Sequence, residues 1–393
     1  MPNYGPPPVL FVEGRGTELF DRRGRRYLDL LCGLAVTTLG HAHPAVTEAL
    51  TRQAGRLLHV SNLFANEHQE PVARTLDRLV RHGAPGTDPG KVLFQNSGAE
   101  ANEAALKLAR RHQGRGRHVV VSALRSFHGR TLATLAATGQ PEKHEPFQPL
   151  PEGFRHVAFD DVEALEAALG PEVGAILLEA VQGEGGVNPA SVDYLRRVRK
   201  ICDERGIVLI LDEIQTGLAR TGAWFAFQHA GILPDIVTVA KALGNGVPVG
   251  AVWARAEIAD AFRPGDHGST FAGQPLALAA ARAVLETLEQ LDAPRLAAER
   301  GAALRARLEA VPGVAGVRGR GLLVAAELEP DVLAGRRAAD VARAALDAAE
   351  GDGPGVVVNG VTPTALRFAP PLVVTDTELD EALSVVSRVL EAP

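Results

Sequence analysis

A lysine and an aspartate each stand at the end of an apolar, strand-like run in the middle of this chain. Lys241 follows the run 236–240, and Asp212 closes the run 207–212. A lysine at the mouth of a buried sheet is partly desolvated, which favours the neutral amine and makes it a nucleophile toward carbonyl groups. A carboxylate in such a position is costly to bury unless it meets a cation, such as a protonated pyridine nitrogen. The two residues therefore indicate chemistry on an aldehyde attached to a positively charged ring.

A third feature is a turn of small residues that precedes a helical pattern. An apolar run ends at residue 96 and is followed by Ser97, Gly98 and Ala99. Small side chains let the backbone approach an anion, and the unpaired N–H groups of a helix N-terminus bind one. The glycine and lysine spacings of a P-loop or of a dinucleotide fingerprint are missing. With Lys241 and Asp212, the turn describes a site for an aromatic aldehyde that carries a phosphate. Pyridoxal phosphate (PLP), held on Lys241 as a Schiff base, is such a ligand.

Each of these residues taken alone has an ordinary structural explanation. Most lysines are solvated surface groups, an aspartate after a strand commonly caps a loop, and Ser-Gly turns commonly cap helices. The hypothesis requires that the three lie together, and the surrounding pattern favours this. Near-continuous Val/Ile/Leu runs alternate with helical patterns, which is typical of an α/β fold with a mostly parallel sheet buried on both faces. Ligands of such sheets bind beyond the carboxyl ends of the strands.

The predicted elements divide the chain into three parts. Residues 1–48 form an N-terminal segment, residues 49–272 a large domain, and residues 273–393 a linking helix with a smaller α+β domain. In the large domain we expect strands at 91–96, 118–122, 174–180, 207–212, 236–240 and 249–254, and helices at 100–110 and 191–205. Elsewhere we expect strands at 10–12, 18–20, 27–29, 322–328, 356–358 and 365–369, and helices from 275 to about 291 and near 336–350 and 376–390.

Composition restricts the function classes. Of 393 residues, 46% are hydrophobic and 22% charged, and the net charge of −6 gives no general attraction to nucleic acid or to an anionic membrane. The arginine-rich stretch 110–117 is expected to be a solvated helix end. The two cysteines, Cys32 and Cys202, form neither a disulfide framework nor a metal-binding pattern. With no secretory signal and no apolar run of about 20 residues, we expect a cytoplasmic protein without a structural metal.

Further short motifs follow one another along the chain. They are Leu39-Gly40-His41 with His43-Pro44, residues 96–102, Phe127-His128-Gly129-Arg130, Gln182-Gly183-Glu184-Gly185-Gly186, residues 212–220, Lys241 and Gly268-Ser269-Thr270. Their order and spacing resemble those of the class III (ornithine-type) aminotransferases of PLP fold type I, from about Phe11 to Leu390. The resemblance implies an α/β large domain, a smaller α+β C-terminal domain and a homodimer with shared active sites.

The resemblance assigns catalytic roles to residues around the cofactor ring. Lys241 would form the Schiff base and then move the proton between the substrate and the cofactor. Asp212 would pair with the pyridine nitrogen, and Gln215 would contact the phenolic oxygen of the ring. Ile214 would pack against one face of the ring and Phe127 against the other.

The resemblance also assigns the remaining contacts with the cofactor. Gly98 and Ala99 would bind the phosphate through their N–H groups, together with Ser97. Thr270 would reach the phosphate of the neighbouring subunit. Glu213, which lies between two ring-contacting residues, is included among the cofactor-binding residues.

Four residues are implied to bind substrate. Arg130, helped by Ser269, would hold the α-carboxylate of an N-acylated ornithine. Arg367 would bind the α-carboxylate of glutamate and 2-oxoglutarate in the bidentate geometry that suits a guanidinium. Glu184 would pair with Arg367 while the ω-amino substrate is bound. An ordinary loop acid for Glu184 and a strand arginine in a surface ion pair for Arg367 are the competing interpretations.

The implied reaction moves the terminal amino group of N2-acetylornithine to 2-oxoglutarate, as in arginine biosynthesis. Other ω-amino donors used within the same family remain alternatives, namely ornithine, succinylornithine, GABA and carrier-linked lysine. An aminomutase reaction is a further alternative. From other classes, a non-catalytic small-molecule-binding protein would be expected to lose Lys241 or Asp212, and a nucleotide-dependent enzyme would need a phosphate fingerprint.

Some positions depart from the family pattern or are held only as pocket candidates. Asn245 stands where a third glycine is usual after Lys241, and Ala272 and Gln274 replace the more usual Gly and Asn. These changes flank the cofactor and remove no catalytic group. Ser61 and Asn62 are candidate residues of the substrate pocket.

Overall fold

A seven-stranded sheet forms the centre of the larger part of the molecule. The computed structural model describes residues 1, 3–84, 86–350 and 353–391, so residues 351, 352, 392 and 393 of the predicted C-terminal domain lie outside it. Six strands of the sheet run in one direction, and β12 runs against both of its neighbours. The strand order is β4 (Lys91–Gln95), β12 (Gly250–Ala254), β11 (Ile236–Val239), β10 (Val208–Asp212), β7 (Val173–Glu179), β5 (Val119–Ala123) and β6 (Phe154–Val157).

Both faces of this sheet are buried, which explains the near-continuous apolar runs. Every residue of β5, β7, β10, β11 and β12 is buried. In β10, Val208 and Ile210 pack into a core with α4 (Gly98–Gln113), whereas Leu209 and Leu211 pack into the other core. That second core includes α3 (Gln69–Val80), α8 (Val192–Arg205) and α10 (Pro275–Gln290). The α/β fold with a mostly parallel sheet is therefore confirmed.

Smaller elements complete the large part. They are α2 (Pro44–Ala54), α5 (Leu132–Ala137), α6 (Pro141–His144), α7 (Val162–Ala167), α9 (Ala256–Ala259), the hairpin β8 (Val181–Gln182) with β9 (Asn188–Pro189), and the 3-10 turns η1 (Glu145–Phe147), η2 (Ala226–Ala230) and η3 (Lys241–Gly244).

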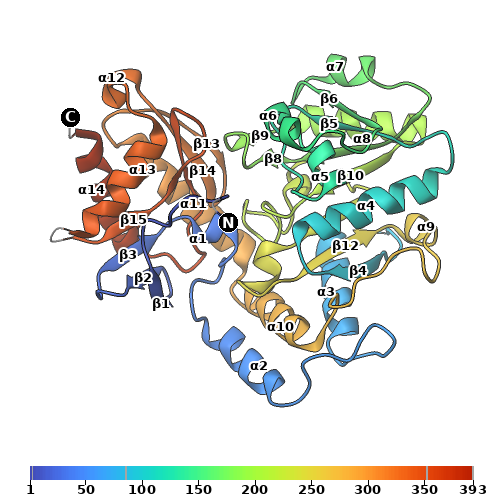
Figure 1. Cartoon of the computed structure of the whole chain (residues 1–393), viewed down its shortest axis with the longest axis horizontal. Helices are drawn as coiled ribbons and strands as arrows, with labels where there is room; N and C mark the ends of the chain where they lie inside the picture. Colours follow the sequence, from blue (N-terminus) through green and yellow to red (C-terminus); the bar gives the residue numbers. More distant parts are fainter. Residues whose placement is uncertain (2, 85, 351–352, 392–393) are drawn as a thin grey trace.

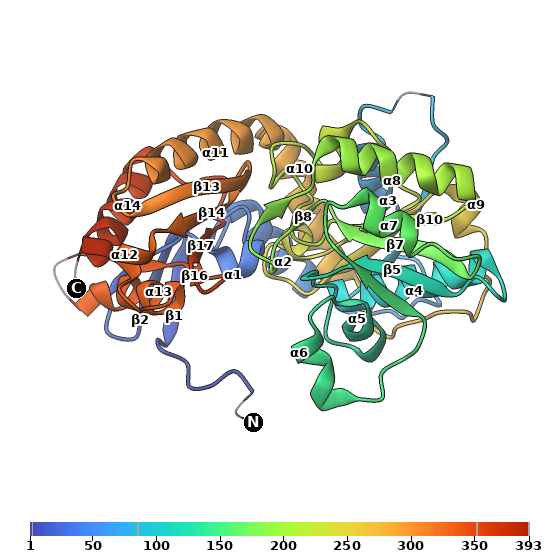
Figure 2. The same ribbon diagram turned by 90° about the horizontal axis from the view of Figure 1, so that it is seen from above.

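A second part of the molecule is built from the C-terminal residues and lies beside the first (Figure 1). Its antiparallel sheet has four strands, and α10 leads into it from the large part (Figure 2). The strand order is β13 (Val314–Arg320), β14 (Leu323–Leu328), β17 (Ala365–Phe368) and β16 (Asn359–Gly360); the helices are α11 (Ala293–Glu309), α12 (Pro330–Leu333), α13 (Ala338–Asp347) and α14 (Asp376–Glu391), and η4 (Ala348–Glu350) follows α13.

The N-terminal strands join this second part. Strands β1 (Phe11–Arg15), β2 (Glu18–Asp21) and β3 (Arg26–Asp29) form an antiparallel meander, and β3 pairs in parallel with β15 (Gly355–Val357). In Figure 1 these blue strands lie beside the orange and red C-terminal elements. The chain then passes through α1 (Cys32–Ala35) to α2 in the large part, so residues 30–43 connect the two parts.

Some elements differ from the sequence-based expectation. Strands β6 and β13 and helix α11 were not predicted. Most residues of β13 are only half-buried, and the strand ends in Arg-Gly-Arg. Its sequence therefore gives only a weak apolar signal. No helix of the described residues is long and apolar enough to span a membrane. Cys32 and Cys202 are both free and buried.

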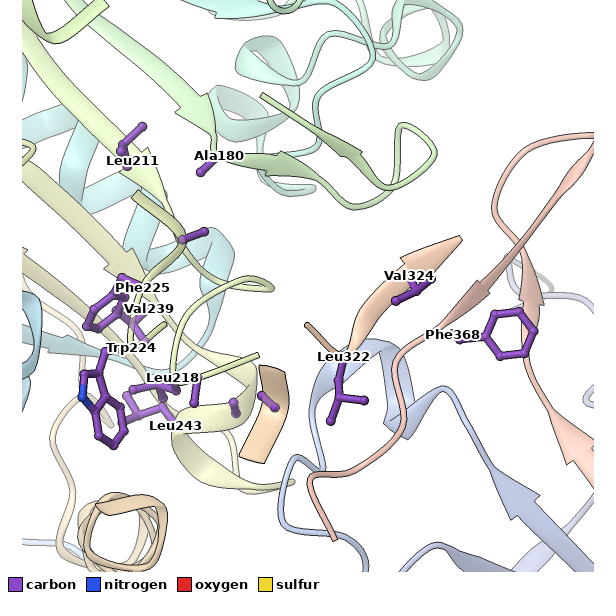
Figure 3. Packing of buried hydrophobic residues seen from close by; sticks show 14 of the residues in the cluster. Ala180, Leu211, Leu218, Trp224, Phe225, Val239, Leu243, Leu322, Val324 and Phe368 are labelled. Atoms are coloured by element: carbon purple, nitrogen blue, oxygen red, sulfur yellow. The ribbon is translucent and has the colours of Figure 1, made fainter. Parts of the chain in front are cut away.

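One hydrophobic core continues from the large sheet into the second part. Leu211 of β10, Val324 of β14 and Phe368 of β17 belong to the same cluster of buried residues (Figure 3). A buried arginine crosses the same junction. The Arg220 guanidinium donates to the carbonyl oxygens of Leu322 (3.2 Å) and Pro370 and to Thr38 Oγ1 (2.8 Å). It thereby joins the loop after β10, the C-terminal part and the N-terminal segment.

Arg220→Met should lower the free energy of unfolding by about 2–4 kcal/mol, because it leaves two buried carbonyl groups without a donor. Urea unfolding followed by circular dichroism measures the change. Arg115→Met, at an exposed arginine, should stay within about 0.5 kcal/mol of the unsubstituted protein. Equal stabilities of the two variants would contradict the bridging role of Arg220.

Candidate active site

The carboxyl ends of three parallel strands meet at one cavity of about 440 Å³. Strand β4 leads to Ser97, β10 ends at Asp212 and β11 leads to Lys241. The antiparallel β12 does not disturb this edge, because β4, β10 and β11 all point the same way. The predicted residues that line the cavity are Ser97, Gly98, Ala99, Phe127, Arg130, Glu184, Asp212, Ile214, Gln215 and Lys241.

Lys241 occupies an unusual backbone position at the mouth of the sheet. Its φ is +44°, in the left-handed region that side-chain-bearing residues rarely adopt, and it begins the 3-10 turn η3. Burial lowers the pKa of its amine below the ordinary value, although the negative charge of Glu184 opposes that effect. Within the described part of the chain the amine forms no ion pair. Lys241 is therefore a strained and partly desolvated amine, available for nucleophilic attack.

Asp212 is almost fully buried and is held by three donors. Its Oδ2 accepts a hydrogen bond from Asn102 Nδ2 at 2.8 Å and lies 2.9 Å from His128 Nδ1. Its Oδ1 accepts from the backbone N–H of Ile214 at 3.1 Å. Because a carboxylate only accepts, His128 presents its protonated Nδ1 to Asp212. The arrangement keeps a buried carboxylate in one orientation at the edge of the cavity.

Two polar residues support Asp212 from the neighbouring elements. Asn102, fully buried in α4, accepts a hydrogen bond from Thr238 Oγ1 of β11 at 2.8 Å and donates to the carbonyl oxygen of His128 at 2.7 Å. The sequence analysis assigned no role to Asn102, Thr238 or His128. A buried asparagine in the Ala-rich stretch 99–109 was the available signal, since such a residue needs partners.

The N-terminus of the 16-residue helix α4 faces the cavity. Ser97 caps the helix, and its hydroxyl accepts from the N–H of Glu100 at 3.2 Å. At Gly98 an added Cβ would lie 2.8 Å from Ile214 Cδ1, so a glycine is required for Ile214 to pack there. At Gly250 an added Cβ would lie 2.5 Å from the Ser97 carbonyl oxygen. Close packing thus fixes an anion-binding helix end beside Ile214.

Glu184 and Gln215 line the cavity, and the buried Arg367, which does not line it, lies behind them. The guanidinium of Arg367, which is 1% exposed, donates through Nη1 to Glu184 Oε1 at 2.5 Å and to Gln215 Oε1 at 3.4 Å. Its Nε donates to Asn359 Oδ1 at 3.1 Å. Burial alone would raise the pKa of Glu184, but the Arg367 charge outweighs it and holds the pKa below its ordinary value. Among the described residues, Arg367 Nη2 is buried without a hydrogen-bond partner.

Glu179 is a cavity residue that the sequence analysis missed. It ends β7, next to Asp212 in the register of the sheet, and its carboxyl accepts from the N–H groups of Phe127 (3.0 Å) and Gly183 (3.2 Å). Burial, together with the nearby Asp212 charge, raises its pKa well above the ordinary value. The residue therefore connects the Phe127 loop to the hairpin that carries Glu184. A terminal Glu on an apolar strand was the signal in the sequence.

Phe127 and Arg130 both line the cavity and come from the segment between β5 and α5. The Arg130 guanidinium carbon lies 5.6 Å from the centre of the Phe127 ring. Arg130 is exposed, whereas Arg367 is buried. The cavity is consequently lined by one exposed arginine, while a second, buried arginine lies behind its residue Glu184, and the two suit different carboxylates.

The structure corrects the expectation for Glu213. Successive side chains of an extended segment point to opposite sides, so Glu213 points away from the cavity that Asp212 and Ile214 line. Its carboxyl accepts from Thr216 Oγ1 (2.5 Å) and from the N–H groups of Ala226 and Phe227. Burial raises its pKa to about 7. Glu213 therefore holds the turn η2 rather than a cofactor.

Four other predicted residues lie outside the cavity of this chain. Ser269 accepts from Asn96 Nδ2 through its Oγ and from Asn62 Nδ2 through its carbonyl oxygen, both at 2.8 Å. Thr270 is exposed, and Ser61 lies with it at a separate shallow hollow. A single copy of the chain thus brings neither Ser269 to Arg130 nor Thr270 to the Ser97 turn.

The family of the chain follows from comparison with known proteins. A family model described as aminotransferase class-III matches residues 1–390. The chain belongs to the class III aminotransferases. This finding confirms the resemblance drawn from the motifs, and it makes the protein an enzyme of the transaminase class.

Individual relatives of this class III aminotransferase are similar over nearly their whole length. An acetylornithine aminotransferase of Caldanaerobacter subterraneus subsp. tengcongensis is 44% identical, covering 99% of this chain and 96% of that protein. The crystal structure of the ornithine aminotransferase of Toxoplasma gondii ME49 has a TM-score of 0.90 at 36% identity, covering 99% of this chain and 92% of that one. The N-acetylornithine aminotransferase of Stenotrophomonas maltophilia K279a has a TM-score of 0.82 at 36% identity, covering 100% and 98%.

Gly183→Ala tests the packing of the Glu184 hairpin against the cavity. An added Cβ would lie 1.8 Å from Gln215 Oε1, so Gln215 must leave its place between Glu184 and Arg367. Overpacking of about 1–3 kcal/mol should lower kcat/KM of amino transfer by roughly 10- to 100-fold. Gly316→Ala serves as the control because its added Cβ meets open space. Steady-state kinetics measures both variants, and unchanged kinetics in Gly183→Ala would refute this role of Gln215.

Proposed function

We propose that this class III aminotransferase uses PLP to move the terminal amino group of N2-acetylornithine to 2-oxoglutarate. The products are N-acetylglutamate 5-semialdehyde and glutamate, as in arginine biosynthesis. The observation that carries the proposal is the meeting of Lys241, Asp212 and the N-terminus of α4 at one cavity. The choice of donor is supported by the similarity to the acetylornithine aminotransferases of Caldanaerobacter and Stenotrophomonas.

The cavity fits the cofactor in its chemistry. Asp212 is a buried acceptor with its geometry already fixed by Asn102 and His128, which suits a protonated ring nitrogen. Ser97, Gly98 and Ala99 offer the helix end for a phosphate, and Ile214 and Phe127 offer apolar surfaces for a ring. When bound, PLP supplies a carbonyl carbon that condenses with amines and a cationic ring that withdraws electrons from the neighbouring carbon.

Lys241 supplies the base of the proposed reaction. Burial lowers the pKa of its amine, which increases the share of the neutral form that nucleophilic attack requires. Once the amine of the donor has taken its place, the free Lys241 amine takes the proton from the terminal CH₂ carbon of the donor. In the second half-reaction it returns a proton to the α-carbon of the product glutamate. Asp212, held by its three donors, would pair with a protonated ring nitrogen at the opposite end of the cofactor.

The two arginines allow one cavity to accept two substrates. In the structure Glu184 covers Nη1 of Arg367, so a carboxylate of the amino donor is directed to the exposed Arg130 instead. The dicarboxylate 2-oxoglutarate can bind Arg367 when Glu184 moves away, because Nη2 is already free of partners among the described residues. Bidentate binding of a carboxylate by a buried guanidinium then replaces the ion pair with Glu184.

A panel of donors tests the proposal, with 2-oxoglutarate as acceptor and glutamate formation as the measurement. N2-acetylornithine should give a kcat/KM at least about tenfold above ornithine, N-succinylornithine and GABA. Lys241→Ala should lose at least about 10⁴-fold in turnover and the visible absorption band of the PLP-loaded enzyme. Lys200→Ala is the control, since the Lys200 side chain is 63% exposed. Turnover of acetylornithine by Lys241→Ala would refute the mechanism, and preference for another donor would refute the substrate.

We further propose that the enzyme is a homodimer that completes each active site with Thr270 of the second copy. Residues 57–66 lie against residues 269–273, where Asn62 and Asn66 donate to the carbonyl oxygens of Ser269 and Gly273. The surface around these bonds carries exposed apolar side chains, which is unusual for a monomer. They are Leu57, Leu58, Leu63, Phe64, Leu93 and Phe271.

The double substitution Phe64→Glu with Phe271→Glu should raise the dissociation constant of the dimer by at least about 100-fold, because it places charges in an apolar interface. Sedimentation velocity measures the shift from dimer to monomer. Phe147→Glu, at an exposed phenylalanine outside this surface, should leave the dimer intact. A monomeric unsubstituted protein at micromolar concentration would contradict the proposal.

A further inference from the structure

A short strap of the N-terminal segment forms part of the cavity wall. We call residues 36–41 the strap; Val36 lines the cavity together with residues 246–249, which follow the Lys241 turn. The strap and this turn lie close together, since a Cβ added at Gly246 would be 3.8 Å from Thr37 Cγ2. One side of the cavity therefore depends on how the strap is held against the Lys241 turn.

The backbone before the strap is unfavourable by itself. Cys32, Gly33, Leu34 and Ala35 all have φ between +52° and +71°, which makes α1 a left-handed turn. L-residues disfavour this conformation, so surrounding contacts must impose it. Asp29 Oδ1 provides one such contact by accepting from the N–H groups of residues 31 and 32, at 3.0 and 2.8 Å. The strap thus begins from a strained turn and requires anchors.

The strap is anchored both to the loop after β10 and to the second part of the molecule. Thr38 Oγ1 accepts from Arg220, and the Thr38 carbonyl oxygen accepts from the N–H of Leu372 at 2.8 Å. At the end of the strap, His41 exchanges two backbone hydrogen bonds with Gly16, at 2.8 and 3.0 Å. None of these contacts reaches the Lys241 turn.

Asn245 makes the connection to the Lys241 turn with both atoms of its amide. Its Oδ1 accepts from the N–H of Leu39 at 2.8 Å, and its Nδ2 donates to the carbonyl oxygen of Gly40 at 3.0 Å. The residue adopts the left-handed conformation, with φ +46° and ψ +40°, which asparagine tolerates better than most residues. Glycine would satisfy the backbone at this position but could not bond the strap.

We propose that Asn245 is a positioning residue that fixes the strap, and with it the Val36 wall, relative to Lys241. The expected change in KM rests on the proposed function, because the Val36 wall would then bound the space that the amino donor occupies. Asn245 lies four residues after the reacting lysine and immediately before the cavity-lining residues 246–249. Loss of its amide should loosen donor binding more than it slows the proton transfers at Lys241.

Asn245→Gly and Asn245→Ala separate the amide from the backbone conformation. Glycine keeps the left-handed backbone and removes the side chain, whereas alanine removes the side chain and strains the backbone. In the PLP-loaded dimer, hydrogen exchange followed by NMR or mass spectrometry should be at least about tenfold faster at the Leu39 amide in both variants. Exchange in α2 (Pro44–Ala54) serves as the internal reference and should not change.

Steady-state kinetics gives the second measurement. The KM for the amino donor should rise about tenfold in Asn245→Gly while kcat changes by less than about threefold, because two hydrogen bonds that shape the wall are lost. The inference would be overturned if Asn245→Gly changed neither the exchange rate of the Leu39 amide nor the KM. Position 245 would then require only a residue that tolerates the left-handed backbone. If the unsubstituted enzyme does not use acetylornithine, the proposed function fails. The Leu39 exchange, and the KM for whichever donor is used, still decide the role of Asn245.

Discussion

The burial of charge at the carboxyl edge of the large sheet is the constraint on which the rest of the structure depends. Asp212 and Glu179 end fully buried strands and are themselves buried, and the half-buried Lys241 follows the fully buried β11. A charge in such a place must be compensated by fixed dipoles or by another charge. Asn102 and His128 do this for Asp212, and two backbone N–H groups do it for Glu179. Among the described residues no hydrogen bond or ion pair holds the Lys241 amine, and burial lowers its pKa.

The second part of the molecule supplies the buried arginine that pairs with Glu184. Arg367 comes from β17, and it reaches Glu184 and Gln215 across the junction between the two parts. The hairpin that carries Glu184 is held from the same side, since Arg318 of β13 donates to the Gly186 carbonyl oxygen at 2.8 Å. Arg220 and the continuous core bring these elements together. The proposed recognition of substrate by Arg367 thus depends on the alignment of the two parts, while the predicted cofactor contacts within the chain depend on the large sheet.

Local pattern predicted the large sheet well because its strands are buried on both faces and read as apolar runs. It also predicted which residues end those runs, and Ser97, Asp212 and Lys241 were found from that rule alone. The antiparallel direction of β12 could not be predicted, because an apolar run does not indicate whether a strand runs parallel or antiparallel to its neighbours. Glu213 was expected at the cofactor because it stands between Asp212 and Ile214. Neighbouring side chains of an extended segment point to opposite sides, so it does not share their cavity. Glu179 ends an apolar run in the same way as Asp212, so its place in the sequence carries the same signal.

The sequence by itself determined the Lys241–Asp212 pair, the α/β class and the family, because residue type, spacing and periodicity are local properties. Only the tertiary structure decided which polar groups meet. Asn102 with Thr238, Glu184 with Arg367, and Asn245 with Leu39 and Gly40 are separated by 136, 183 and more than 200 positions in the chain. No local pattern encodes such pairs, since their geometry arises from the packing of the sheet, the second part and the strained N-terminal strap.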